Sequence, residues 1–398
     1  RGHHWFVGDG MVHGIRLCGG KAEWYHNRYI KSATLERNGG PPAAGGPRRG
    51  ARDTVNTNVL KLAGKTLALV ESGPFPFELD RNLDTVASTN LQGTLKAPLS
   101  AHPHEDPKTG EWHAITYESE TQDTVWHVAI NRAGEVIAER PIAVKDGPSI
   151  HECSITDDYV IVFDLPVTIS LPTLAQGYNF AYRWNKAHPA RVGLLPRRGN
   201  VNEIIWCDFN PCYVFHVANS FQNDDGSVTI DCCAYESMFA HGPDGPNGVP
   251  CGFERWRVDP ESQKVARSAI DASPQEFPRI DERHFGQPYR HAWIVSQPSD
   301  TVTNFVAENA LYHHDIETGE KRSYTFGPNL VGGEFVFAHR APDAGEADGW
   351  LMGLVIDAKN NATQLQFFEA LDIERGPIGA VHIPHRIPPG FHGNWIPD

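Results

Sequence analysis

Cys212-Tyr-Val-Phe-His216 and Val228-Thr-Ile-Asp-Cys232 are two short runs of the chain, and the turn Asp224-Asp-Gly226 lies between them. Both runs are rich in β-branched and aromatic residues, and the turn ends in glycine, which is the pattern of an antiparallel hairpin. Runs of the same kind recur at Thr66–Val70 and Tyr159–Phe163, whereas helical periodicity is scarce. The sequence therefore predicts an all-β protein.

Turns of similar sequence connect these runs. Asp106–Gly110, Asn131–Gly134 and Asp315–Gly319 each suit a type I turn followed by a glycine in the left-handed region. Many antiparallel hairpins in a chain of 398 residues must protect their edge strands, and radial repetition in a β-propeller does so. Propellers of this length form one unit, so we expect a propeller as a single domain. No repeat of fixed period marks its blades.

The composition argues against several classes of partner. The chain has 49 acidic and 35 basic residues, a net charge of −14, so a polyphosphate partner is a poor fit and we expect no nucleic acid. The basic run Pro47–Arg52, which overlaps the end of the Pro/Gly-rich segment Gly39–Gly50, is expected to be a solvated loop. The cysteine count is odd, at seven, and no apolar run approaches the roughly 20 residues that span a bilayer. These features predict a cytoplasmic protein.

Four of the twenty histidines share a context, because each lies at the edge of a strand-like run beside small or turn-forming residues. They are His102, His151, His216 and His392. No two of them belong to one local metal motif, so they could form a site only where separated strands converge, as inner strands do around a propeller axis. Imidazoles suit iron, copper and zinc alike. On the residues alone, a four-histidine metal site and ordinary buried histidines both remain open.

A resemblance to a known protein family favours the metal site. It begins at His4-Trp-Phe-Val-Gly-Asp-Gly-Met-Val-His-Gly14 and ends at Pro389-Gly-Phe-His-Gly-Asn-Trp395. The blocks between them are Tyr25–Tyr29, Asn56–Asn58, Leu69–Gly73, Ala101–Pro107, Phe215–Asn219, Gly333–Phe337 and Asp348–Trp350. In content and order they resemble the carotenoid cleavage oxygenases. The resemblance implies one seven-bladed propeller domain over residues 1–398, with a helical and loop dome above an axial metal. Since the chain opens inside a motif, we expect further residues of that domain before Arg1.

The resemblance also implies the metal and its ligands. In that family four histidines hold Fe(II), and the matching positions are His102, His151, His216 and His392. His104 is a rival for the first position, because Ala101-His-Pro-His offers two candidates, but the family ligand follows the alanine. The second motif departs from the family, since Glu152 follows His151 where aspartate is common.

Outer carboxylates usually orient such imidazoles and raise their basicity. The resemblance places three of them here: Glu71 for His151, Glu276 for His216 and Glu334 for His392. For Glu276 and Glu334 the alternative is a solvated carboxylate at a strand end.

The activity implied is oxidative cleavage of a double bond in an apolar polyene, a carotenoid or apocarotenoid, by O2 to give two carbonyl products. Stilbene cleavage is the alternative. The stilbene-cleaving branch has a lysine immediately before the glutamate that matches Glu71, and this chain has Val70 there. The resemblance makes Phe6 a tunnel-wall residue, and plain core packing is its other reading.

Functions of other classes remain open. A non-catalytic propeller scaffold would need no convergent histidines, and a calcium-binding propeller hydrolase would use aspartate and asparagine ligands. A serine hydrolase is disfavoured, because the chain has no Gly-x-Ser-x-Gly motif.

The segment 165–175 carries no charge. We expect it to contact a membrane peripherally at the mouth of a substrate tunnel, and a lid packed inside the dome is the alternative.

Overall fold

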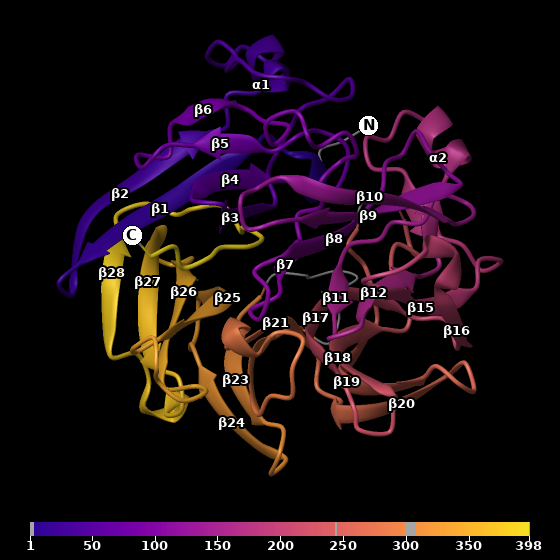
Figure 1. Cartoon of the computed structure of the whole chain (residues 1–398). Coiled ribbons are helices and arrows are strands. Elements are labelled where there is room, and N and C mark those ends of the chain that lie inside the picture. The colour runs from indigo at the N-terminus through magenta and orange to yellow at the C-terminus, as the bar shows by residue number, and fades with distance from the viewer. Residues whose placement is uncertain (1–3, 243–244, 299–306, 398) are drawn as a thin grey trace.

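The computed structural model describes residues 4–242, 245–298 and 307–397. Within these residues the strands form four four-stranded sheets, one eight-stranded sheet and two two-stranded sheets. Figure 1 shows the larger sheets arranged around a common centre, with the first strand of each four-stranded sheet nearest the centre and the last strand at the rim. This is a propeller-like arrangement, so the all-β prediction is confirmed.

Each four-stranded sheet is a simple antiparallel meander. The first contains β3 (Asn58–Leu62), β4 (Lys65–Leu69), β5 (Phe77–Leu79) and β6 (Thr85–Ser88). The second contains β7 (His104–Glu105), β8 (Trp112–Thr116), β9 (Thr124–Ile130) and β10 (Val136–Ala143). The third contains β21 (Gln275–Ile280), β22 (His291–Ser296), β23 (Ala310–Asp315) and β24 (Glu320–Thr325). The fourth contains β25 (Leu330–His339), β26 (Gly349–Asp357), β27 (Ala362–Glu369) and β28 (Gly379–Ile383).

The eight-stranded sheet consists of two antiparallel halves. One half contains β11 (Cys153–Ile155), β12 (Tyr159–Asp164), β15 (Ala190–Pro196) and β16 (Ile205–Phe209). The other contains β17 (Tyr213–Gln222), β18 (Val228–Tyr235), β19 (Pro250–Asp259) and β20 (Lys264–Asp271). A parallel contact between β16 and β20, with Asp208 opposite Lys264, joins the halves. The two-stranded sheets pair β1 (Met11–Cys18) with β2 (Lys21–Tyr29), and β13 (Val167–Ile169) with β14 (Tyr182–Trp184).

The predicted hairpins are present. β17 pairs with β18 across the turn that ends at Gly226, although both strands run beyond the predicted limits. The four predicted turn glycines have φ between +68° and +82°, in the left-handed region that a side chain would disfavour. Each of these glycines donates a backbone hydrogen bond across its turn, for example from Gly110 N to Asp106 O (2.7 Å) and from Gly319 N to Asp315 O (2.8 Å). Local turn chemistry therefore sets these connections.

Helix is a minor part of the described chain. The α-helices are α1 (Ala33–Arg37) and α2 (Leu171–Ala175), and the 3-10 turns are η1 (Trp5–Val7), η2 (Val201–Glu203), η3 (Glu282–His284) and η4 (Ile373–Arg375). Helices of five residues are too short to be stable alone and depend on the packing around them. Helices therefore contribute little to the fold of the described residues.

The basic loop is not simply solvated, which corrects the prediction from composition. Arg48 forms an ion pair with the buried carboxylate of Asp53, and Arg49 contacts Glu118 at 2.6 Å. Asp53 also accepts hydrogen bonds from the first two backbone N–H groups of α1, at 2.8 and 2.9 Å. A buried carboxylate needs such partners, so the arginines anchor this loop to the rest of the protein.

Candidate metal centre

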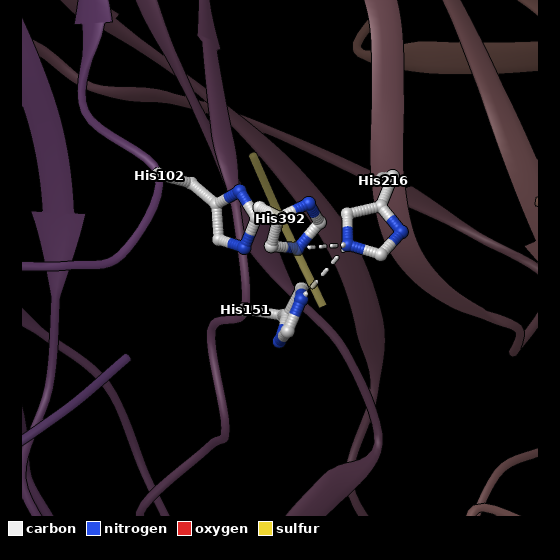
Figure 2. Close-up of side chains that lie close together, drawn as sticks. All are labelled: His102, His151, His216 and His392. Carbon is white, nitrogen blue, oxygen red and sulfur yellow. Dashed lines mark hydrogen bonds between the residues drawn. The ribbon is translucent and has the colours of Figure 1, made fainter. Parts of the chain in front are cut away.

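The chain brings the four predicted histidines together from distant segments. His102 and His151 lie just before β7 and β11, and His216 lies within β17. His392 lies in the C-terminal tail, where its backbone N–H donates to Thr57 O at 3.2 Å beside β3. One ligand nitrogen from each ring lies within 4.8 Å of the others, and Figure 2 shows the rings grouped around a common point. Convergence of inner strands thus creates the cluster.

Local irregularities in three inner strands aim the polar side chains inward. The register of β17 shifts between Val214 and Val217, around His216. The register of β25 shifts around Glu334, and that of β21 shifts directly after Glu276, where Phe277 has a φ of +57°. An extra residue in a strand turns a side chain away from the regular alternation, and such bulges are common beside functional sites.

Each predicted carboxylate contacts its predicted histidine. Nδ1 of His151 lies 2.7 Å from Oε2 of Glu71. Nδ1 of His216 lies 2.7 Å from Oε2 of Glu276, and Nδ1 of His392 lies 3.1 Å from Oε1 of Glu334. Glu276 is almost fully buried. The alternative of solvated strand-end carboxylates does not describe Glu276 or Glu334, whose side chains are largely enclosed.

These contacts determine which ring nitrogen carries the proton. An ionised carboxylate can only accept, so Nδ1 of His151, His216 and His392 donates and Nε2 keeps a lone pair. The Nε2 atom of His216 lies 3.2 Å from that of His151 and 3.1 Å from that of His392. Lone pairs at this distance repel each other, and a cation between them removes the repulsion. Nε2 of His102 is buried and has no hydrogen-bond partner within the described part of the chain. This donor set fits a divalent transition metal.

Burial and the neighbouring charges shift the pKa values of the cluster in different directions. Burial, together with the neighbouring imidazoles, lowers the pKa of His102 well below its usual value. Burial alone would raise the pKa of Glu334, but Arg279 and His392 outweigh it and hold that pKa at about 2. Burial would lower the pKa of His216, but the charge of Glu276 outweighs it and raises that pKa, which shows how strongly this site attracts positive charge.

His104 lies outside the cluster. Its ring stacks on Phe285 at 4.1 Å, and its Nε2 donates to Oε1 of Glu152 at 2.8 Å. Of the two histidines in the Ala101-His-Pro-His motif, the structure therefore places only His102 with the other three.

An aromatic group covers one side of the cluster. Phe6 makes edge-to-face contacts with Phe180, Phe215, Phe239 and Phe391 at centroid distances of 5.5 to 6.1 Å. The ring of Phe215 in turn lies 4.9 Å from that of His151. Phe6 thus belongs to an apolar wall near the histidines.

A cavity of about 840 Å³ reaches the cluster from the side of β1 and β25. Its lining near the histidines includes Trp5, Phe277, Glu334 and His392. Farther out, apolar side chains such as Ile15 alternate with charged ones such as Arg16. Phe6 and Val70 are not among its lining residues.

The uncharged segment 165–175 occupies two environments. Leu165 and Val167 are buried, and β13 is part of the protein interior. Leu171 and Leu174 on α2 are 55% and 51% exposed. The first half of the segment is therefore packed inside the protein, as the lid alternative expects, and the second half presents an exposed apolar surface. No described helix is long and apolar enough to cross a membrane.

Sequence reasoning missed several supporting residues. Oε1 of Glu71 accepts hydrogen bonds from the hydroxyl groups of Tyr117 and Ser149, the latter at 3.2 Å. Arg279 donates to Oε1 of Glu334 at 3.2 Å. Glu152 stands out in the sequence only as a departure from the family motif, and its position beside His151 is the signal that could have identified it.

Comparison with known proteins identifies the family. The family model described as "Retinal pigment epithelial membrane protein" matches residues 1–397. A carotenoid cleavage oxygenase of Mycobacterium tuberculosis is 35% identical over 442 aligned positions, covering 99% of this chain and 88% of that protein. A resveratrol cleavage oxygenase of Aspergillus fumigatus is 27% identical, with coverages of 98% and 85%.

Solved structures agree. The lignostilbene dioxygenase of Pseudomonas brassicacearum superimposes with a TM-score of 0.88 at 25% identity, covering 99% of this chain and 88% of that one. A variant of the Synechocystis apocarotenoid oxygenase superimposes with a TM-score of 0.87 at 26% identity and the same coverages. The family model matches nearly the whole chain, and four histidines gather at the centre of a propeller-like fold. The chain therefore belongs to the carotenoid cleavage oxygenase family.

Proposed function

We propose that this protein is a non-haem Fe(II) dioxygenase that cleaves one double bond of a carotenoid or apocarotenoid with O2, giving two carbonyl products. The observation that carries the proposal is the convergence of His102, His151, His216 and His392, of which three are held by carboxylates with Nε2 free to bind a cation. Iron bound there would supply the chemistry of O2 activation. The protein's own residues would hold the metal, exclude water and orient the alkene.

Each carboxylate pair has a defined task in this proposal. Glu71, Glu276 and Glu334 keep the Nδ1 protons of their imidazoles in place and so keep Nε2 available. Tyr117 and Ser149 fix Glu71 from its other oxygen. We also propose that the chain is one domain of seven blades: the four four-stranded sheets, the two halves of the eight-stranded sheet and the β1–β2 hairpin.

The direct test is anaerobic loading of the purified protein with Fe(II), followed by aerobic incubation with carotenoids, apocarotenals and resveratrol. We expect carbonyl products whose masses locate the cleaved bond in a polyene. A protein that takes up iron at the cluster yet leaves every polyene intact would contradict the substrate class, and one that takes up no iron would contradict the centre.

Apolar side chains near the site support the proposed substrate class. The phenylalanines around Phe6 and the apolar part of the cavity lining offer burial to a long hydrocarbon, and Val70 offers no cation to a phenol. Relatives named for lignostilbene and resveratrol keep stilbene cleavage as the alternative.

Replacing Val70 by lysine tests this choice. We expect turnover of an apocarotenal to fall by roughly 10-fold or more if the substrate lies beside Val70, as we propose, because an unpaired ammonium group there disfavours an apolar molecule. Turnover of resveratrol should rise relative to turnover of the apocarotenal. Val70→Leu is the matched control and should keep the preference for the polyene. Faster cleavage of resveratrol than of any polyene by the parent protein would favour the stilbene alternative.

We propose that α2 contacts the membrane in which such a substrate dissolves. Leu171 and Leu174 are exposed, and each buries apolar surface if α2 enters the headgroup region. Changing both to glutamate should weaken liposome co-sedimentation by about 10-fold or more, given the transfer free energy of two leucine side chains. Turnover of detergent-solubilised substrate should persist.

The matched control is Val86→Glu combined with Ile137→Glu, two similarly exposed apolar residues on β6 and β10. The control should sediment like the parent protein. Equal loss in both double variants, or no sedimentation of the parent, would rule out a role for α2.

A further inference from the structure

A fourth carboxylate lies beside the histidine cluster. Glu152 is 5% exposed and directly follows His151. Its Oε1 accepts a hydrogen bond from Nε2 of His104 at 2.8 Å, and its Oε2 accepts one from the backbone N–H of Val217 at 2.7 Å. Val217 directly follows His216. One side chain therefore connects segments that carry three of the four clustered histidines.

His102 is the histidine that lacks a carboxylate at hydrogen-bond distance among the described residues. Its Nδ1 lies 3.9 Å from Oε1 of Glu152, and its Nε2 is buried without a partner. A bridging water or a small rotation of the ring would close the remaining gap. Two neighbours keep the carboxylate of Glu152 close to His102. One is the ring of His104, which is itself stacked on Phe285, and the other is the backbone N–H of Val217, which binds Oε2.

We propose that Glu152 is a positioning residue of the metal centre, serving His102 as Glu71, Glu276 and Glu334 serve the other histidines. This inference rests on the proposed metal site. Neutral imidazoles leave the charge of a divalent cation uncompensated, and Arg279 adds a further positive charge beside Glu334. Glu152 supplies a negative charge on the side of His102, and its two hydrogen bonds hold the segments of His102, His151 and His216 in register.

The test uses cobalt(II), whose visible absorption reports the geometry and strength of its ligands, in the otherwise intact protein. A cobalt-substituted structure of the Synechocystis apocarotenoid oxygenase shows that the metal is a practical probe for a relative. Glu152→Gln keeps the length of the side chain and an acceptor for Val217 N–H, but removes the charge. We expect about a 10-fold loss of cobalt affinity and a shifted visible spectrum.

The matched control is Glu105→Gln, which removes the same charge from an exposed residue on β7, next to His104. It should retain the affinity and spectrum of the parent. Glu152→Asp is the second variant: it keeps the charge but shortens the reach, so the spectrum should shift while affinity falls less than in Glu152→Gln. The melting temperature of each metal-free variant separates a folding defect from a defect at the site.

The outcomes are distinct. Unchanged spectra and affinities in both Glu152 variants would overturn the role of Glu152 while leaving the metal centre intact. A lowered affinity in Glu105→Gln equal to that in Glu152→Gln would reduce the effect to general charge and would also overturn it. A parent protein that takes up no cobalt would overturn the proposed centre itself.

Discussion

Replacing His216 by alanine is expected to abolish iron binding, so that the metal content falls from about one equivalent to near zero and turnover is lost with it. His216 is the central histidine of the cluster, because its Nε2 lies within 3.2 Å of the Nε2 atoms of both His151 and His392. The change also leaves Glu276 buried without its partner, which should lower the free energy of unfolding by roughly 1–3 kcal/mol. Metal analysis and thermal unfolding of the metal-free protein measure the two effects.

His104→Ala is the matched control for that experiment. His104 contacts the outer carboxylate Glu152 and lies outside the cluster, so this variant should retain most of its iron. If His104→Ala lost iron and His102→Ala kept it, the first ligand would be His104. If His216→Ala bound iron like the parent, the four-histidine centre would be wrong.

Replacing Glu71 by glutamine is expected to lower metal affinity and turnover by roughly 10–100-fold, less steeply than loss of a ligand. The Oε2 atom of Glu71 holds the Nδ1 proton of His151 at 2.7 Å. Glutamine has nearly the same shape, but it lacks the charge. If its NH2 group faces Nδ1, it favours the other tautomer, in which the proton occupies Nε2 and blocks the metal.

The control for Glu71→Gln is Glu78→Gln, on the neighbouring strand β5, where the carboxylate pairs with Lys65 near the surface. That variant should behave like the parent protein in both measurements. Parent-like metal affinity and turnover in Glu71→Gln would show that Glu71 has no role in the metal centre and that other groups orient His151.

The residues alone predicted what depends on near neighbours in the chain. Strand-forming runs separated by turns gave the all-β class, and the turn glycines, such as Gly226 and Gly319, adopt the left-handed conformation expected of them. Motif content, through the family resemblance, singled out His102 rather than His104 and paired each of three histidines with a glutamate. The all-β class and the turn glycines needed only local chemistry, and the choice of site residues needed only the order of motifs.

The tertiary structure decided what depends on contacts between distant segments. The shifts in register that turn His216 and Glu334 inward arise from pairing with neighbouring strands. The alternation of apolar and polar residues in the sequence does not predict them. Burial likewise depends on the whole fold. Within the uncharged segment 165–175, Val167 is buried in the interior, whereas Leu171 and Leu174 face solvent.

Glu152 shows the difference most clearly. In the sequence it is one acidic residue beside a histidine, while in the fold it joins His104 to the backbone next to His216. The sequence determined the strands, the turns and the residue types able to bind a metal, because these follow from each residue and its neighbours. Only the tertiary structure determined which groups meet, because the closing of the propeller brings together side chains that are far apart along the chain.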